Sequence, residues 1–349
     1  MGSGKTLQKA RIQNKNLLSF KNFLLFGLPL ICFFSSLVIG RYGASPFEVF
    51  KLIFEKLICR KNQLPMALET IIFDIRLPRI CAAMLIGGGL SVSGASFQGI
   101  FRNPLVSPFI LGVATGAGFG AAIGILLSGN NLVIQGSAFL FGMLAVMISY
   151  GLTKIYKTSS ILVMVLSGVI VGSFFSALIS LIKYIADPYD KLPVIVFWLM
   201  GSLASISKND LFIIALPMVT GIGIMFSIRW KIGVLSMGEE EAQSLGLNST
   251  KLRILLVLSA TFVTASAVAV SGVIGWVGLV IPHLARMITG PDYRKLIPLS
   301  LSLGACYLLL IDTLARNLIT GEVPLGILTA TLGAPIFAII LKKGTLGWS

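Results

Sequence analysis

Long uncharged stretches dominate the chain and are separated by short segments that carry the charged residues. Because a membrane span needs roughly 20 apolar residues, each long stretch predicts a transmembrane helix. Two stretches predict two helices each, since 103–153 is interrupted at Gly129-Asn130-Asn131 and 254–285 near Ser271-Gly272. The pattern predicts an all-α polytopic membrane protein with ten spans, near 22–40, 80–101, 107–128, 132–153, 158–182, 211–228, 254–272, 274–288, 296–311 and 323–341.

An eleventh apolar stretch, 192–207, is shorter than the others and contains Gly201-Ser202. It predicts a helix that does not cross the membrane, because it falls short of the length of a span. The chain is therefore expected to form one transmembrane domain, 22–343. A basic tail (1–21), an outer loop (41–79), a cytoplasmic segment (229–253) and a C-terminal tail (344–349) complete the expected organisation.

Composition and charge support a membrane protein rather than a nucleic-acid-binding one. Hydrophobic residues make up 56% of the chain and charged residues only 12%, about half the usual share in soluble domains. The net charge is +15, but its distribution carries more information than its size. With the N-terminus in the cytoplasm and ten spans, 17 of the 28 Lys and Arg residues fall inside, as the positive-inside rule requires. Both termini are therefore expected in the cytoplasm, with membrane lipid and no nucleic acid as a partner.

Few ionisable residues fall inside the predicted spans. Asp312 and Arg316 are four residues apart and could pair on one helix face, whereas His283 is the only histidine. No nucleophile–base pair and no metal-ligand spacing is visible, and the four cysteines are interpreted as packing residues. An ion-coupled secondary transporter or an intramembrane enzyme normally needs such groups, so the energy for any transport is expected to come from a partner.

Segment 229–253 contains the most distinctive soluble stretch of the chain. Three acids, 239–241, begin a short helix in the orientation that the helix dipole favours, and Leu245-Gly246 ends it. Ala242 and Leu245 would give this helix an apolar face. The stretch is either a solvated loop or a surface that docks onto a cytoplasmic partner.

Glycine and other small residues cluster within several spans, above all at 87–96 and 112–120. Small residues let helices pack closely, and in a protected pore they also let a helix open. Both interpretations stay open for Gly112, Thr115 and Gly116.

Several separated motifs, in one order along 70–343, resemble the FecCD-type permeases of binding-protein-dependent ABC importers for iron–siderophore, haem, vitamin B12 and related chelates. They are Arg76-Leu77-Pro78-Arg79, Ser93-Gly94-Ala95 with Phe101-Arg102-Asn103-Pro104-Leu105, Leu111-Gly112-Val113 with Gly116-Ala117-Gly118, Gly238-Glu239 with Ala242, Leu245 and Gly246, Gly278-Leu279-Val280-Ile281-Pro282-His283, Asp312 with Ala315-Arg316, and Glu322-Val323-Pro324-Leu325-Gly326.

The resemblance implies a type II ABC importer permease that is itself not an enzyme and pairs with a second copy in the cytoplasmic (inner) membrane. Two cytoplasmic ATPase subunits, which bind the ATP and Mg, would dock at Gly238, Glu239, Ala242, Leu245 and Gly246. A periplasmic or lipid-anchored binding protein would dock its glutamates on Arg76, Arg79 and Arg316. The competing interpretation pairs Arg316 with Asp312 and leaves Arg76 and Arg79 to lipid headgroups.

The resemblance also implies a translocation pathway, while this chain itself would hold no cofactor or metal. A short helix at about 194–206 would form the outer gate, and span 158–182 would line the pathway. The pathway and gate residues implied are Gly112, Thr115, Gly116, Ser173, Ser176, Ser180 and Gly201. A ferric siderophore is the favoured substrate, with cobalamin, haem or molybdate as alternatives.

Overall fold

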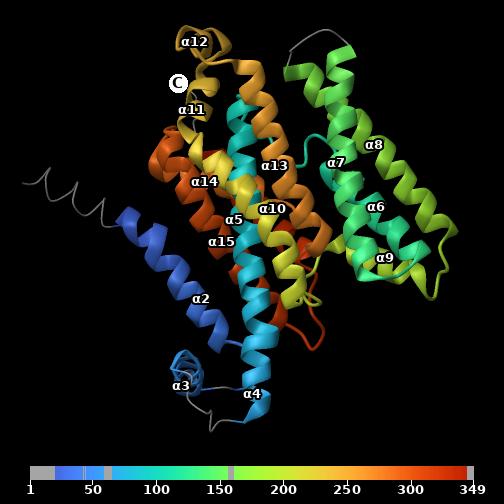
Figure 1. The fold of residues 1–349 in the computed structure, drawn as a ribbon, viewed down its shortest axis with the longest axis vertical. Helices are drawn as coiled ribbons and strands as arrows, with labels where there is room; N and C mark the ends of the chain where they lie inside the picture. The colour runs from blue at the N-terminus through green and yellow to red at the C-terminus, as the bar shows by residue number, and fades with distance from the viewer. Residues whose placement is uncertain (1–19, 42, 44, 59–64, 156–160, 344–349) are drawn as a thin grey trace, which may run out of the picture.

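The computed structural model describes residues 20–41, 43, 45–58, 65–155 and 161–343. The predicted tails 1–21 and 344–349 lie almost entirely outside these residues. All regular elements of the described part are helices, as the sequence predicts (Figure 1). They are α2 (Leu28–Val38), α3 (Pro46–Leu57), α4 (Met66–Thr70), α5 (Leu77–Phe101), α6 (Val113–Leu127), α7 (Asn131–Ile155), α8 (Ile161–Ile185), α9 (Lys191–Met200), α10 (Lys208–Ser227), α11 (Arg229–Met237), α12 (Glu239–Ser244), α13 (Ser249–Ser271), α14 (Val277–Thr289), α15 (Tyr293–Asn317) and α16 (Leu325–Lys343), with π-helical turns at Phe23–Gly27 and Ile71–Arg76.

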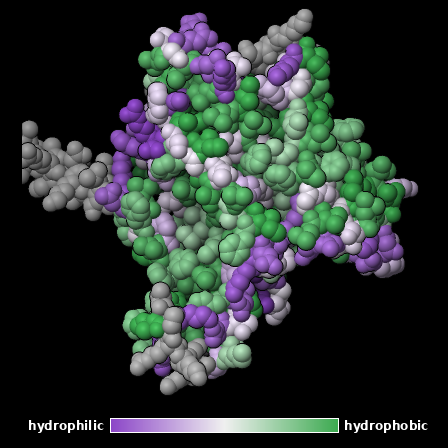
Figure 2. Space-filling model, viewed as in Figure 1, coloured by the Kyte–Doolittle hydropathy of each residue, from purple (hydrophilic) through white to green (hydrophobic). Residues whose placement is uncertain are grey.

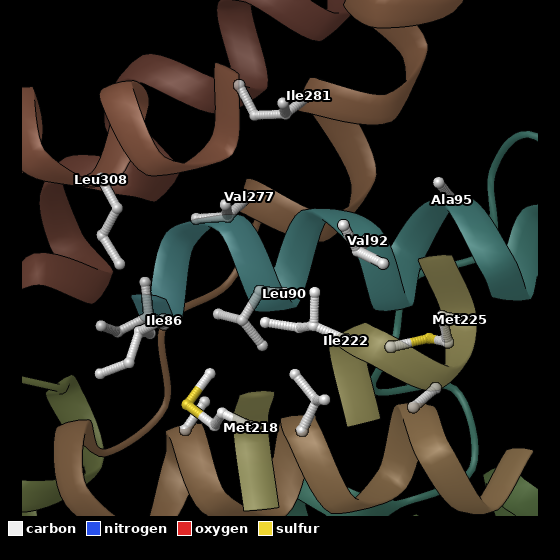
Figure 3. Close-up of a cluster of buried hydrophobic side chains, with 14 of the residues drawn as sticks. Ile86, Leu90, Val92, Ala95, Met218, Ile222, Met225, Val277, Ile281 and Leu308 are labelled. Carbon is white, nitrogen blue, oxygen red and sulfur yellow. The ribbon is translucent and has the colours of Figure 1, made fainter. Parts of the chain in front are cut away.

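Helix α5 forms the centre of the molecule, with α10, α13, α14 and α15 around it (Figure 1). The most apolar windows of the α4–α5 helix and of α13 are 83% and 78% buried, against 28% for both α8 and α10. The close-up shows Leu90 of α5 facing Met218 and Ile222 of α10, with Val277 of α14 on the other side of α5 (Figure 3). The outer helices therefore turn most of their apolar surface away from the chain, as expected where lipid or a second subunit covers it.

Glycines explain how the helices approach α5 so closely. A Cβ atom at Gly94 would lie 1.8 Å from the Gly278 carbonyl oxygen of α14. A Cβ at Gly87 would lie 2.3 Å from the Gly304 carbonyl oxygen of α15. Close packing through small residues is therefore the role of this part of the glycine-rich pattern.

Two irregular segments interrupt the helices on either side of α5. Residues 102–112 connect α5 to α6, and 272–276 connect α13 to α14. The first segment packs against the start of α14, where a Cβ at Gly278 would lie 2.5 Å from the Pro108 ring. Ser149 of α7 donates a hydrogen bond to the Leu111 carbonyl oxygen at 3.0 Å. Non-helical backbone at membrane depth requires such burial within protein, so both segments depend on their neighbours.

Seven helices among the described residues are long and apolar enough to span a membrane, and four shorter apolar helices accompany them: α6, α9, α14 and the Leu325–Ile340 part of α16. The count of ten spans stays a prediction. Helix α9 is 10 residues long, half of what a span needs. Helix α6 begins at Val113 rather than near 107, because the preceding residues form the irregular segment.

The predicted outer loop, 41–79, contains more helix than the sequence analysis expects. Its first part forms α3, which begins with a capping box between Ser45 and Glu48. Its second part belongs to one continuous helix, Met66–Ile100, that includes α5. The charged residues Asp74, Arg76 and Arg79 interrupt the apolar run, so a criterion based on uncharged length places the start too late.

The molecule has two distinct polar ends. Helices α11 and α12 lie at one end, and α3 and α4 lie at the opposite end (Figure 1). Hydrophobic residues cover most of the visible face between them, with hydrophilic residues gathered mainly toward the upper and lower parts (Figure 2). We call the α12 end the cytoplasmic end and the α3–α4 end the outer end, following the orientation predicted from the positive-inside rule.

Candidate functional site

The outer end contains a buried cluster of opposite charges. Arg79 of α5 donates from Nε to Asp312 Oδ1 of α15 at 2.9 Å. Its two terminal nitrogens donate to the two carboxylate oxygens of Glu322, both at 2.8 Å. Arg316 lies on the other side of Asp312, with 3.2 Å between Nε and Oδ2. The Asp312 side chain is 0% exposed, so the cluster holds a fully buried carboxylate between two guanidinium groups.

Three arginines connect the cluster to α2 and the residues just beyond it. Arg76 donates from Nη1 to the Leu37 carbonyl oxygen at 2.6 Å. Arg316 donates from Nη2 to the Ser36 hydroxyl at 2.9 Å. Arg41, just beyond α2, donates to the Arg316 carbonyl oxygen in the last turn of α15 and to carbonyl oxygens of 319–321 beyond it. The cluster therefore joins α2, α5, α15 and the connection to α16.

The three predicted docking arginines thus lie together at one end, but inside the chain rather than on its surface. Arg76 and Arg79 are 4% and 5% exposed, which disagrees with the interpretation that they contact lipid headgroups. The pairing of Arg316 with Asp312, which that interpretation also proposed, agrees with the geometry. Docking of a binding protein on these arginines stays a prediction. No role was predicted for Glu322, whose partner Arg79 is 243 positions away in sequence.

Gly201, predicted as a gate residue, ends α9 with a backbone φ of +76° that favours glycine. Its carbonyl oxygen accepts from the Leu325 amide at the start of α16, at 2.8 Å. The next amide, of Ser202, donates to the Ser271 carbonyl oxygen at the end of α13, also at 2.8 Å. Main-chain hydrogen bonds therefore fasten three elements at one turn, which we call the Gly201 clasp. That this clasp gates a pathway stays a prediction.

A pocket of about 440 Å³ lies beside the Gly201 clasp, between the outer ends of α7, α9, α10 and α13. Its polar wall is organised by Asp210, which accepts from Gln135 Nε2 at 2.7 Å and from the Ser207 hydroxyl at 2.6 Å. Asp210 thereby caps α10 and joins it to α7. This pocket was not predicted, because its residues come from four separate connections and no local motif marks them.

The predicted pathway residues of α6 lie at helix contacts. Gly112, with φ +81°, is buried against α8, where its Cβ would lie 3.3 Å from the Gly172 amide nitrogen. Gly116 is buried against α7, where its Cβ would lie 2.5 Å from the Phe141 carbonyl oxygen. Thr115 is half-buried, and its hydroxyl donates to the Gly112 carbonyl oxygen. Of the two open interpretations, close packing therefore accounts for both glycines, and a pathway role stays a prediction.

The predicted pathway residues of α8 lie on a free surface instead. Ser173, Ser176 and Ser180 are all exposed and lie on the face of α8 that also carries Ile170 and Phe174. Within the described part of the chain no other element covers this face. The serines are therefore available to line a pathway or an interface with a second subunit.

The cytoplasmic end confirms a short acidic helix, α12, but alters its predicted apolar face. Ala242 is 0% exposed and packs into the chain's own core, so it cannot contact a partner. Leu245 is 63% exposed, and Gly246 ends the helix with φ +73°. Glu239 pairs with Arg253 of α13, which fixes α12 to the membrane domain. Of the predicted coupling residues, Leu245 is the apolar side chain that projects.

The remaining candidate chemistry is sparse. His283 packs edge-on against Phe337 of α16 with ring centroids 5.9 Å apart, and its Nδ1 has no hydrogen-bond partner. The described residues contain no group of three His, Cys, Asp or Glu side chains that could hold a metal ion. The predictions of no metal and no cofactor bound by this chain stay predictions.

Non-helical segments buried beside a central helix are typical of membrane transport proteins, and residues 102–112 and 272–276 have this arrangement. The chain belongs to the FecCD transport family, whose model matches residues 28–343.

Named relatives come from several import systems. The molybdate import permease MolB of Haemophilus influenzae is 39% identical over 323 residues, covering 92% of this chain and 95% of MolB. A probable iron chelatin transport permease of Helicobacter pylori strain 26695 is 42% identical over 277 residues, covering 79% and 84%. The vitamin B12 import permease BtuC of Vibrio cholerae is 34% identical over 329 residues, covering 92% and 93%.

Solved structures confirm the fold class. An inward-facing structure of a transporter assigned to the metal-chelate ABC type matches with a TM-score of 0.83 and 39% identity, covering 95% of this chain and 100% of that one. PsaBC of Streptococcus pneumoniae, solved with a Fab, matches with a TM-score of 0.55 at 20% identity, which supports the fold alone. The chain is therefore a multi-pass permease subunit with the type II ABC importer fold.

Proposed function

We propose that this chain is the non-catalytic membrane subunit of an ATP-driven importer for a ferric chelate in the cytoplasmic membrane. A second copy completes the pathway, and two cytoplasmic ATPase subunits bind ATP and Mg. A binding protein delivers the substrate at the outer end. The observation that carries the proposal is the Gly201 clasp, which closes the outer end through main-chain bonds that a small helix movement can break.

The cytoplasmic and outer ends of the molecule have different roles in the proposed transport cycle. At the cytoplasmic end, Leu245 projects from α12, while Ala242 and the Glu239–Arg253 pair fix α12 to the membrane domain. Because Arg253 belongs to α13, a movement of a docked ATPase is transmitted from α12 to α13. The outer end of α13 carries Ser271, one of the residues in the Gly201 clasp. ATP-driven movement at one end thus reaches the closure at the other along a single helix.

The second copy is proposed from two uncovered surfaces. Helix α8 exposes Ile170, Phe174 and its serines, and α16 exposes Ile336 and Ile339. Helix α16 packs only along a narrow stripe, where Gly333 meets the Trp276 side chain of the irregular segment. A mixed serine and apolar face suits an interface that also borders an aqueous pathway, since lipid would be a poor solvent for the serines.

The substrate is proposed from the relatives and from the exposed serines of α8, a helix whose one charged residue is Lys183 in its last turn. Serine hydroxyls offer weak, general contacts, which suit a large chelate whose selection is made by the binding protein. A ferric siderophore is the first candidate, supported by the iron chelatin relative. Molybdate is the second, because the similarity to MolB extends over nearly the whole of both chains.

The test is uptake into proteoliposomes that contain this chain and its ATPase, with the cognate binding protein and ATP supplied from the appropriate sides. Radiolabelled ferric siderophore, haem, cobalamin and molybdate are offered in turn. We expect ATP-dependent uptake of the ferric siderophore, and uptake of molybdate instead would establish the second candidate. An ATPase variant that cannot hydrolyse ATP is the control. Transport driven by an ion gradient without ATP would show a secondary transporter and overturn the proposal.

A further inference from the structure

Glu322 lies between the buried guanidinium group of Arg79 and the solvent. Its carboxylate accepts both terminal nitrogens of Arg79 in the bidentate geometry that arginine and carboxylate prefer. The Arg79 side chain is 6% exposed and that of Glu322 is 29% exposed. A carboxylate that approaches from outside therefore meets Glu322 first, and it reaches the terminal nitrogens of Arg79 only if Glu322 leaves.

The cluster holds more positive than negative charge. It contains four guanidinium groups and two carboxylates: Arg79 and Arg316 contact Asp312 or Glu322, while Arg41 and Arg76 donate to nearby carbonyl oxygens. Asp312 is inaccessible because it is fully buried beneath Arg79 and Arg316. The excess of two positive charges favours further carboxylates at this surface, and Glu322 is the one internal carboxylate that can be exchanged.

We propose that Glu322 is an internal substitute for a partner's carboxylate, and that docking proceeds by exchange. An acidic side chain of the binding protein replaces Glu322 on Arg79, and Glu322 moves outward into solvent. This inference rests on the proposed function, because it assumes a binding protein at the outer end. It explains how arginines buried inside the chain take part in a contact between proteins.

The exchange would also affect the Gly201 clasp at the outer end. Glu322 lies in the segment between α15 and α16, and its neighbour Val323 donates to the Ala315 carbonyl oxygen at 3.3 Å. Two residues further, the Leu325 amide makes the bond to Gly201 that forms part of the Gly201 clasp. When Glu322 leaves Arg79, this segment loses its side-chain anchor beside the clasp. Docking and loosening of the closure are thereby the same event.

The exchange predicts that a mutation at the docking surface strengthens binding, whereas mutations at such surfaces usually weaken it. In Glu322→Gln the competing carboxylate is gone, so the binding protein no longer has to displace it. We expect the Kd of the cognate binding protein for nanodisc-embedded permease–ATPase complex to fall by about threefold to tenfold, in line with the energy of a partly exposed charge pair. Glu322→Asp keeps the charge and should stay near wild type. The Tm should fall only slightly in Glu322→Gln, because a partly exposed pair contributes about 1 kcal/mol or less and Arg79 keeps its contact with Asp312.

Two controls separate exchange from a general change of charge. Glu69→Gln removes another outer-end carboxylate, one that pairs with Lys56 outside the cluster, and should leave the Kd within about twofold. Raising the salt to 0.5 M screens long-range attraction, so a gain that arises from exchange persists relative to wild type.

The outcomes distinguish the two proposals. Tighter binding of Glu322→Gln at both salt concentrations supports exchange. Equal or weaker binding of Glu322→Gln, or an equal gain in Glu69→Gln, overturns exchange while the importer stands. A wild-type complex that does not bind the cognate binding protein at all overturns the proposed function, and the exchange with it.

Discussion

The outer and cytoplasmic ends of the molecule use charge in opposite ways. At the outer end, Asp312 and Arg79 are buried and bonded to each other, and Glu322 is the most accessible acid of that cluster. At the cytoplasmic end, Glu240 and Glu241 of α12 are exposed, and among the residues that the structure describes only Glu239 of the three acids has an ion-pair partner, Arg253. Buried pairs hold helices in place, whereas exposed acids leave a surface free. Under the proposed function, a binding protein would therefore have to rearrange the outer end, whereas an ATPase would dock directly at the cytoplasmic end.

The largest expected effect comes from breaking the outer cluster at its buried centre. Asp312→Asn leaves Arg316 and part of Arg79 without a compensating charge, which costs about 3–5 kcal/mol for a buried pair. We expect a strongly lowered Tm and loss of assembled permease, measured by thermal unfolding in detergent. The matched control is Asp190→Asn, whose side chain is 72% exposed and should change little. A Tm of Asp312→Asn equal to that of the control would show that the cluster does not stabilise the fold.

The second effect tests the Gly201 clasp. In Gly201→Ala the alanine must adopt the positive backbone φ of Gly201, which costs about 1–3 kcal/mol. Its Cβ would also lie 2.8 Å from the Val273 carbonyl oxygen. We expect ATP-dependent uptake to be lost. Gly129→Ala is the matched control, because φ is also positive there but the nearest atom, Lys191 Nζ, is 3.9 Å away. Equal uptake by both variants would contradict a role of the Gly201 clasp in transport.

The third effect tests direct docking at the cytoplasmic end. Leu245→Glu places a charge where an apolar side chain projects, and should weaken ATPase binding about tenfold, or about 1.4 kcal/mol, without lowering the Tm. The measurement is co-purification of the ATPase with the permease, together with its Kd. Tyr189→Glu, at an outer-end side chain that is 94% exposed, is the control. Full retention of the ATPase by Leu245→Glu would place the docking surface elsewhere.

The smallest effect is the pH dependence of Glu322. Burial opposes its ionisation, but the hydrogen bonds and charge of Arg79 outweigh burial and lower the pKa of Glu322. A lowered pKa means that the contact stabilises the fold at pH values above the usual value of about 4.3, and that this contribution is lost as the pH falls through the lower, folded value. Hydrogen exchange of the Val323 and Leu325 amides should therefore stay protected from pH 7 to 5, after correction for intrinsic rates. A loss of protection in that window would contradict the pairing.

The pattern of uncharged stretches predicts a helix well where it is apolar over nearly its whole length, as in α7, which was expected at 132–153 and spans Asn131–Ile155. It fails at the ends of α5, α10 and α15, where the helix continues through charged residues such as Arg76, Asp210 and Arg316. These charges are tolerated because each finds a partner from a distant part of the chain. A criterion that treats charge as the boundary of a span cannot anticipate those partners.

The candidate site was predicted in its residue types more than in its geometry. The spacing of Asp312 and Arg316 predicts their pairing within one helix, and the structure contains it. The contact of Arg79 with Glu322 joins two distant segments, so no local pattern indicates it. The orientation of α12 could not be predicted either, because six residues are too few to define a face, and Ala242 turned out to be buried.

The Gly201 clasp is made of peptide groups, and every residue type except proline carries the same amide donor and carbonyl acceptor. Side chains around it can therefore vary without changing the bonds that we propose close the outer end. A permease that comes to work with a different binding protein and a different substrate can therefore keep the Gly201 clasp unchanged. Closure that does not depend on the transported substrate is consistent with one fold serving relatives named for molybdate, iron chelates and vitamin B12.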